Sequence, residues 1–167
     1  MYGLALTSLV LAIITIFQSV ALPKPITGCL VNAGFVLVVR RAGLAYGLLL
    51  GITTPLLALL TGILPAPLLP LVIPITLGNA LFIYLYEKLM KKPLIARLLL
   101  PPLGKWLTIA LTANLVLRLF GFGDELNAVV LLIITIQAFT ALGGILIGEF
   151  LDRRIPHKRE HGSPLSE

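Results

Sequence analysis

Lys105 is the side chain in this sequence that is best placed to do chemistry. It lies near the middle of a long apolar segment, directly after the four residues Pro101-Pro102-Leu103-Gly104. A cation among apolar residues needs an acceptor, an anion or water, and a proline pair removes backbone donors and opens a helix locally. Lys105 could therefore hold an anionic or carbonyl-bearing ligand in a cavity. The alternative is a lysine whose apolar stem lets the ammonium reach the polar boundary of the segment.

Side-chain amides are the other polar groups within the apolar segments that could bind a ligand. They are Asn32, Asn79, Asn114 and Gln137. Each could equally form a hydrogen bond between helices that fixes their packing. Thr108 and Thr112 follow Lys105 at helical spacing and form a polar stripe with it. Asn114 and Arg118 fit this stripe less well.

The apolar segments contain no set of residues typical of catalysis or metal binding. Both histidines, His157 and His161, lie in the polar C-terminal stretch, so a nucleophile would lack a base and zinc its usual ligands. No acidic cluster able to bind magnesium lies in an apolar segment, and there is no phosphate-binding loop. Cys29 is the only cysteine, so no disulfide can form within the chain. We therefore expect no enzyme activity, no metal and no cofactor.

The segments around these polar groups predict an integral membrane protein. The chain is 58% hydrophobic and 12% charged, whereas soluble domains carry about 25% charged residues. The apolar segments are continuous rather than alternating, so we predict an all-α fold with six transmembrane helices. The predicted helices are Tyr2–Leu22, Ile26–Val39, Leu44–Leu64, Leu68–Met90 (regular from about Pro74), Leu94–Phe120 and Leu126–Leu151.

The second predicted helix, Ile26–Val39, is short. Its 14 residues rise only about 21 Å, less than the roughly 30 Å of the hydrocarbon core. An outer loop that folds over its end would cover the difference and create a partly closed cavity on the outer side. Residues 40–43, Arg40-Arg41-Ala42-Gly43, are expected to form a tight turn on the other side.

The basic residues predict the orientation of the chain. Ten of the 13 lysines and arginines fall on one predicted side, whereas only Lys24 and Arg118 fall on the other. The positive-inside rule then places both termini in the cytoplasm. Because the net charge of +6 lies at helix ends, we expect contact with the lipid bilayer and none with nucleic acid.

This orientation divides the chain into two parts and three outer loops. Residues 1–151 form the transmembrane domain, and residues 152–167 form a polar, disordered cytoplasmic tail. Asp124 and Glu125 are expected to cap the last helix. The outer loops are Pro23–Pro25, Pro65–Pro70 and Gly121–Glu125.

Small residues spaced four apart predict close contacts between helices, either within the chain or with a partner subunit. The first helix contains two such pairs, and three glycines lie in the second half of the last helix. These residues are Gly3 with Thr7, Ser8 with Ala12, and Gly143, Gly144 and Gly148.

Three passages occur in a characteristic order and are followed by Lys105. They are Pro25–Ala33 (PITGCLVNA), Gly51–Pro65 (GITTPLLALLTGILP) and Pro74–Leu81 (PITLGNAL). In these passages, in length, in helix number and in the position of its termini, the chain resembles the substrate-binding (S) components of energy-coupling factor (ECF) vitamin transporters. The resemblance covers nearly the full length.

The resemblance implies a protein that captures a scarce vitamin or vitamin precursor from the outer side with high affinity. Such a protein has no ATPase, docks on a transmembrane coupling subunit with two cytoplasmic ATPases, and topples in the membrane to release substrate inward. It is a multi-pass protein of the inner or plasma membrane of a prokaryotic cell.

The resemblance also guides the choice of site residues. We expect a pocket in the outer half, lined by helices four to six and closed by the first two outer loops. Its expected polar anchors are Asn79, Lys105, Asn114 and Gln137, with Asn32 as a second choice. Lys24, Lys105 and Arg118 favour an anionic or carboxylate-bearing substrate, an effect that Asp124 and Glu125 partly offset.

The chain departs from the family pattern at its first helix. Family members usually carry an alanine pair four apart that meets the coupling subunit, and the nearest match here is Ser8 with Ala12. Members for nickel or cobalt begin Met-His, whereas this chain begins Met1-Tyr2, so we expect no metal substrate.

Two other functions are compatible with six apolar helices. A structural membrane subunit of the cell-shape or cell-wall assembly type has similar length and helix number, and it would bind no small molecule. A stand-alone secondary transporter would move substrate without partners, although the internal repeats that such folds often show are not evident.

Overall fold

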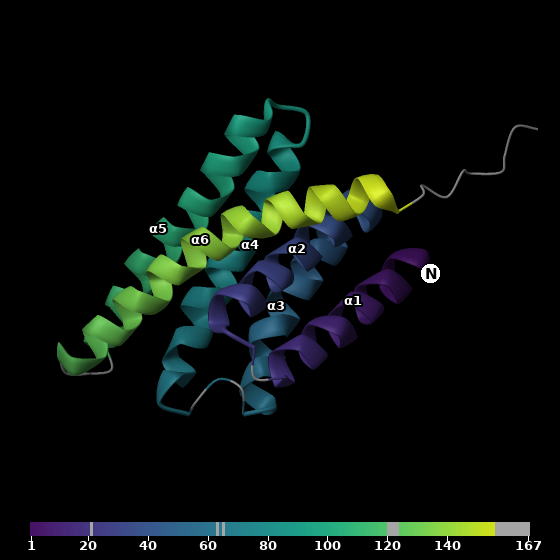
Figure 1. Ribbon diagram of the computed structural model, residues 1–167. Coiled ribbons are helices and arrows are strands. Elements are labelled where there is room, and N and C mark those ends of the chain that lie inside the picture. The colour runs from purple at the N-terminus through teal and green to yellow at the C-terminus, as the bar shows by residue number, and fades with distance from the viewer. Residues whose placement is uncertain (21, 63, 65, 120–123, 156–167) are drawn as a thin grey trace, which may run out of the picture.

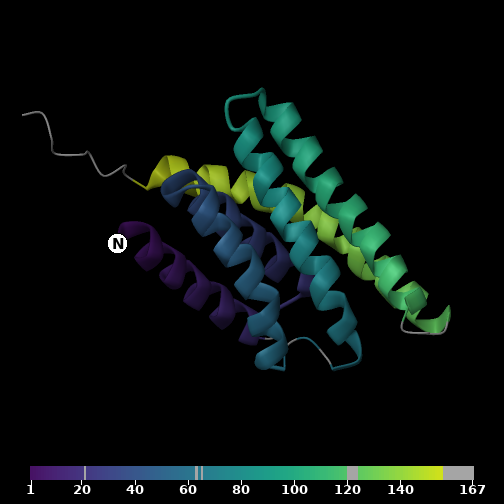
Figure 2. The same cartoon turned by 180° about the vertical axis from the view of Figure 1, so that it is seen from behind.

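The computed structural model describes residues 1–20, 22–62, 64, 66–119 and 124–155, and only the backbone of residues 66, 67 and 124–130. Its regular elements are all helices, which confirms the predicted all-α fold. They form one bundle in which α4 and α5 lie side by side and α6 crosses α2 (Figures 1 and 2). The elements are α1 Tyr2–Ser19, α2 Lys24–Ala42, α3 Leu44–Leu60, the 3-10 helix η1 Ala66–Leu71, α4 Val72–Leu89, α5 Leu94–Leu119 and α6 Asp124–Arg154.

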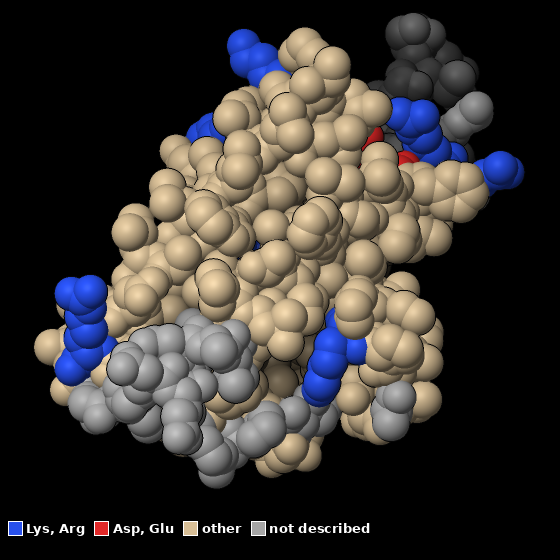
Figure 3. Space-filling model, turned by 60° about the vertical axis from the view of Figure 1, so that its left-hand side comes forward, with Lys and Arg blue, Asp and Glu red and all other residues tan. Residues whose placement is uncertain are grey.

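Five helical stretches are long and apolar enough to cross a membrane. They are Tyr2–Ser19, Lys24–Ala42, Leu68–Leu89, Leu94–Leu119 and Leu131–Arg154, and α3 is a shorter apolar helix. Large apolar side chains cover the outside of the bundle. On the face shown in Figure 3, basic side chains lie mainly at the two ends, with a broad uncharged region between them. This surface is consistent with a multi-pass membrane protein.

The beginning of α1 and the end of α6 lie at the same end of the bundle (Figure 1). We call this the N-terminal end. The α2–α3 and α4–α5 turns lie there as well, whereas the α1–α2 and α3–α4 connections lie at the opposite end (Figures 1 and 2). Most of the lysines and arginines that the structure describes lie in the segments at the N-terminal end, as the sequence predicts.

The second helix is longer than predicted, so the argument from a short helix is wrong. α2 has 19 residues and begins at Lys24, with Pro25 in its first turn. Proline is well tolerated there because a first-turn N–H has no partner within the helix. At the other end Arg40 and Arg41 continue the helix, and Gly43 alone separates α2 from α3 with a φ of 95°. Glycine adopts this left-handed conformation without the steric cost of a Cβ.

The other predicted boundaries agree more closely. α1 ends at Ser19 and α3 ends at Leu60, three and four residues before the predicted ends. η1 precedes α4, which confirms that the regular part of this segment begins near Pro74. α5 runs without interruption through Pro101 and Pro102. The predicted outer loop Gly121–Glu125 lies largely outside the described residues.

Glycines bring α2 and α6 into the most extensive helix contact of the bundle. A Cβ at Gly144 would overlap Asn32 and lie 3.0 Å from the backbone nitrogen of Ala33. A Cβ at Gly148 would lie 2.7 Å from Cβ of Val36. The predicted close contact through small residues of the last helix is therefore confirmed, and its partner is α2.

Asp152 belongs to the packed end of α6 and not to a disordered tail, so that prediction is wrong. It is 2% exposed and accepts hydrogen bonds from Nε of Arg40 at 2.6 Å and Nε of Arg41 at 2.5 Å. Arg41 also donates to the backbone oxygens of Asp152 and Ile155, each at 2.5 Å. These bonds extend α6 to Arg154 because they hold its last turn against α2. Residues 156–167 lie outside the described residues.

Glu149 extends this polar cluster to α4 and α5. Its carboxylate accepts from Arg97 at 2.7 Å and from the hydroxyl of Tyr86 at 3.2 Å. Arg40 also donates to the Tyr86 hydroxyl at 3.4 Å. One continuous network of ion pairs and hydrogen bonds therefore joins α2, α4, α5 and α6 at the N-terminal end.

Candidate functional site

A cavity of about 580 Å³ lies in the half of the bundle away from the ion-pair network. All six α-helices contribute to its lining, as does the α3–α4 connection. Residues near the α1–α2 connection, such as Gln18, Leu22 and the exposed Lys24, lie at its open side. Figure 3 shows a hollow at this end of the molecule, beside a basic side chain. From Lys24 to Asn32, α2 rises about 12 Å along the cavity wall.

The cavity wall is mostly apolar with a few polar groups. The aliphatic part comes from every helix except α1 and α5, together with the connections near Leu22 and Leu64. The polar residues are Gln18, Lys24, Thr27, Asn32, Thr54, Asn79, Lys105, Gln137 and Thr140. Two of these are lysines, and none of the lining residues that the structure describes is acidic. This combination of apolar walls and a few polar groups is typical of a small-molecule site.

Lys105 lies at the floor of the cavity and is 1% exposed. Its ammonium donates to Oδ1 of Asn32 at 2.8 Å. The rings of Phe35 and Phe82 lie beyond it, with their centres 5.9 and 5.5 Å from Nζ. A cation above aromatic faces gains some electrostatic stabilisation. The lysine therefore points inward, and the alternative of an ammonium that reaches the membrane boundary does not apply.

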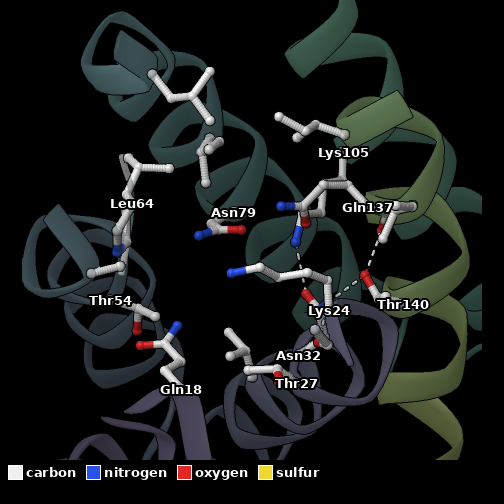
Figure 4. Close-up of a pocket in the computed structure, with 18 of the residues that line it drawn as sticks. Gln18, Lys24, Thr27, Asn32, Thr54, Leu64, Asn79, Lys105, Gln137 and Thr140 are labelled. Atoms are coloured by element: carbon white, nitrogen blue, oxygen red, sulfur yellow. Dashed lines mark hydrogen bonds between the residues drawn. The ribbon is translucent and has the colours of Figure 1, made fainter. Parts of the chain in front are cut away.

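Two further hydrogen bonds orient the side chain of Asn32. Its Nδ2 donates to the backbone oxygen of Gly28 at 2.8 Å and to the hydroxyl of Thr140 at 3.4 Å. These two bonds fix the amide so that its oxygen faces Lys105 (Figure 4). Because the three partners come from α2, α5 and α6, the floor of the cavity is also a junction of three helices.

Asn79 lies on the opposite wall, on α4 (Figure 4). It is 2% exposed, and its Nδ2 donates to the backbone oxygen of Gly51 on α3 at 3.2 Å. Its Oδ1 is buried and has no hydrogen-bond partner among the described residues. Thr54, on the same wall, bonds to its own helix at Leu50. Asn79 therefore offers an unused acceptor at the cavity.

Four of the five predicted polar anchors come together at this cavity: Asn32, Asn79, Lys105 and Gln137. The fifth, Asn114, does not. It is exposed and donates to the backbone oxygen of Ala110 at 2.7 Å. Nine residues separate it from Lys105, and at about 100° per residue this places the two on opposite sides of α5.

The two threonines of the predicted polar stripe along α5 are also not part of the cavity wall. The hydroxyls of Thr108 and Thr112 donate to the backbone oxygens of Gly104 and Thr108, at 2.8 and 2.6 Å. Neither residue lines the cavity. These threonines satisfy their polar groups within their own helix, which is the usual behaviour of threonine in apolar helices.

The expectation that helices four to six line the pocket was too narrow. α2 contributes Lys24, Thr27, Gly28, Val31 and Asn32, more than any other helix. The sequence did contain a signal, since Lys24, Gly28 and Asn32 follow one another at spacings of four residues and therefore share one face of a helix. The boundary assigned at Ile26 left Lys24 in a loop and concealed its place on this face.

The two small-residue pairs of α1 have different surroundings. Gly3 and Thr7 are buried, and Gly3 lies against the ring of Tyr46 on α3. Ser8 and Ala12 are exposed and border a shallow groove between α1 and Leu57 of α3. The predicted contact of Ser8 and Ala12 with a partner subunit stays a prediction, and the groove shows that this face is open.

Replacing Asn32 tests the floor of the cavity. We expect Asn32→Leu to lower the free energy of unfolding by about 2 kcal/mol, because it removes the one acceptor that the described residues offer to a buried ammonium. Thermal unfolding in detergent would measure the change. Thr140→Val is the matched control, since it removes the 3.4 Å contact to Asn32 and a 3.2 Å bond to the backbone of its own helix at Gln137, and it should cost below about 1 kcal/mol. Equal effects of the two variants would contradict this account.

The described residues contain no group of three or more histidine, cysteine or acidic side chains that could hold a metal ion. The polar groups on the apolar wall of the cavity are two amines, four side-chain amides and three hydroxyls, a set that can bind a polar ligand. Comparison with models of known protein families finds no match to this chain. Comparisons with curated proteins and with solved structures find no similar protein either.

Proposed function

We propose that this protein is the substrate-capture subunit of an ATP-driven importer of the ECF type, and that it binds a vitamin or vitamin precursor. The cavity carries the proposal. Its volume of about 580 Å³ lies within the roughly 300–1,000 Å³ of small-molecule sites. The buried Lys105 at its floor and the buried amide oxygen of Asn79 on its wall, which has no partner among the described residues, are costly in an apolar bundle. A bound ligand would offset this cost.

The direction of capture follows from the distribution of charge. Basic residues concentrate at the N-terminal end, and the positive-inside rule assigns such an end to the cytoplasm. The cavity lies in the other half, so it would open to the outer side of the cell or plasma membrane. Inward release would depend on partners, because the sequence has no phosphate-binding loop. We propose a transmembrane coupling subunit and two ATPases, with the Ser8 and Ala12 face of α1 as the docking surface.

A thermal-shift screen of the purified chain against water-soluble vitamins and their precursors tests this function. A ligand present at a thousand times its dissociation constant should raise the free energy of unfolding by about 4 kcal/mol. For a chain of this size the corresponding rise in the unfolding midpoint is roughly 8–16 °C. We expect at least one compound to produce it.

Two variants separate binding in the cavity from binding elsewhere. Asn79→Leu should abolish most of the shift, whereas Asn114→Ala, on the outside of α5, should leave it unchanged. The absence of any shift from a broad panel, with the protein folded, would overturn the capture function and favour a structural role in the membrane.

A further inference from the structure

The ammonium of Lys105 has no anionic partner among the described residues. None of the ion pairs in this part of the chain involves it, and its one hydrogen bond goes to the neutral amide of Asn32. Arg97, another basic side chain that points into the bundle, pairs with the carboxylate of Glu149. An ammonium has three donors, and one is used here. A buried cation without a counter-charge is strongly unfavourable.

Among the described residues, the charged groups of the cavity wall have one sign. Lys105 lies at the floor and Lys24 at the open side, and none of the described lining residues is acidic. In Figure 4 the side chains of both lysines extend over the same cavity. The field inside an apolar cavity is poorly screened. A negative group that enters would therefore be attracted by both amines and would meet no acidic side chain among the described residues of the lining.

Asn79 supplies a second and independent requirement. Its Oδ1 accepts no hydrogen bond although it is buried, and leaving such an acceptor unpaired costs about 1–3 kcal/mol. Water or a ligand with an N–H or O–H group would satisfy it. Nδ2 of the same amide is already used by Gly51, so the amide oxygen is the group left for a ligand.

We propose that the ligand is a small monocarboxylate that also carries an N–H or O–H donor, an inference that rests on the capture function above. The carboxylate binds the ammonium of Lys105 and the donor binds Oδ1 of Asn79, with Lys24 attracting the anion at the open side. The aliphatic wall surrounds the remainder of the molecule.

The choice of a monocarboxylate follows from the number of buried charges. One fully buried cation neutralises one negative charge, whereas Lys24 is exposed and its charge is screened by solvent. A phosphate monoester carries up to two charges and three strong acceptor oxygens. The remaining polar side chains at the floor are neutral, so such a group would leave charge unpaired in an apolar cavity.

Pairs of acids and their uncharged counterparts test the inference on the unmodified protein. We would measure dissociation constants in nanodiscs of neutral lipid for biotin and its methyl ester and for pantothenate and panthenol, with lipoate and nicotinate as carboxylates that lack a further N–H or O–H donor. Thiamine represents cations and pyridoxal phosphate represents phosphate esters. We expect one acid to bind about 10- to 100-fold more tightly than its counterpart, the range for a buried charge-assisted hydrogen bond.

Substitution of Lys105 then locates the anion. In Lys105→Met the preference for the acid should fall below about threefold, whereas Lys105→Arg keeps the charge and should keep part of it. Asn79→Leu should weaken the acid and its counterpart by the same factor, because it removes the acceptor that both use. If Lys105→Met does not fold, the acid pairs on the native protein and the arginine variant still decide the question.

The outcomes separate this inference from the function on which it rests. Tight binding of a neutral, cationic or phosphorylated compound, without preference for any acid, would overturn the monocarboxylate and leave capture standing. An acid preference unchanged in Lys105→Met would also overturn the assignment. No binding by any of these compounds or by the wider vitamin panel would overturn both.

Discussion

Replacing Asp152 with alanine should lower the free energy of unfolding by about 3 kcal/mol. The substitution removes the buried carboxylate shared by Arg40 and Arg41 at the α2–α6 contact. Loss of one partner of a buried ion pair typically costs about 3–5 kcal/mol, and partial exposure of Arg40 places this case at the lower end. In detergent, the unfolding midpoint should fall by roughly 6–12 °C.

Two further variants show whether the loss of stability comes from the charge of Asp152 or from any substitution at this end of α6. Asp152→Asn keeps an acceptor and should cost about half as much. Arg153→Ala changes the neighbouring exposed residue and should change stability by less than about 0.5 kcal/mol. If Asp152→Ala and Arg153→Ala unfold at the same temperature, residues beyond Leu151 do not contribute to the fold.

Gly144→Leu should be the most damaging substitution within α6. The Cβ of the new side chain would already overlap Asn32 and lie 3.0 Å from the backbone nitrogen of Ala33. Because backbone atoms of α2 cannot rotate away, the two helices must separate. We expect a loss of about 3 kcal/mol, the upper part of the usual range for overpacking, and a loss of ligand binding, since Asn32 moves with α2.

A leucine elsewhere on the same helix is the control. Thr135 is exposed and donates only to its own backbone at Leu131. Thr135→Leu should therefore leave both stability and binding nearly unchanged. Thermal unfolding and a binding measurement on both variants would check the prediction, and equal destabilisation would show that the α2–α6 contact tolerates a side chain.

The fold could be predicted well from the sequence because every helix coincides with a long, continuous apolar segment. The errors occur where a proline or a charged residue was taken as the end of a helix. Pro25 was read as a break although it lies in the first turn of α2, and Asp152 was read as the start of a tail although it pairs with α2. In both cases the deciding fact is a tertiary or helix-end contact that residue type alone does not show.

The candidate site was predictable in its residue types but not in its lining. Lys105 and the amides Asn32, Asn79 and Gln137 were identified because polar groups in apolar helices need a partner. Asn114 satisfied the same criterion and lies on the outside, since a single amide can bond to its own helix. Whether an amide faces inward depends on the rotation of its helix about the helix axis, which residue type alone does not show.

The two ends of the bundle differ in stiffness because of where the polar contacts lie. Among the described residues, side-chain hydrogen bonds between helices occur at the cavity floor or in the network at the N-terminal end. Spreading the rim around Gln18, Lys24 and Leu64 would break none of these bonds. A molecule leaving toward Asp152 would have to part ion pairs that hold four helices together. Under the proposed function, uptake into the cavity would need only thermal motion, whereas passage through the protein would require work supplied from outside.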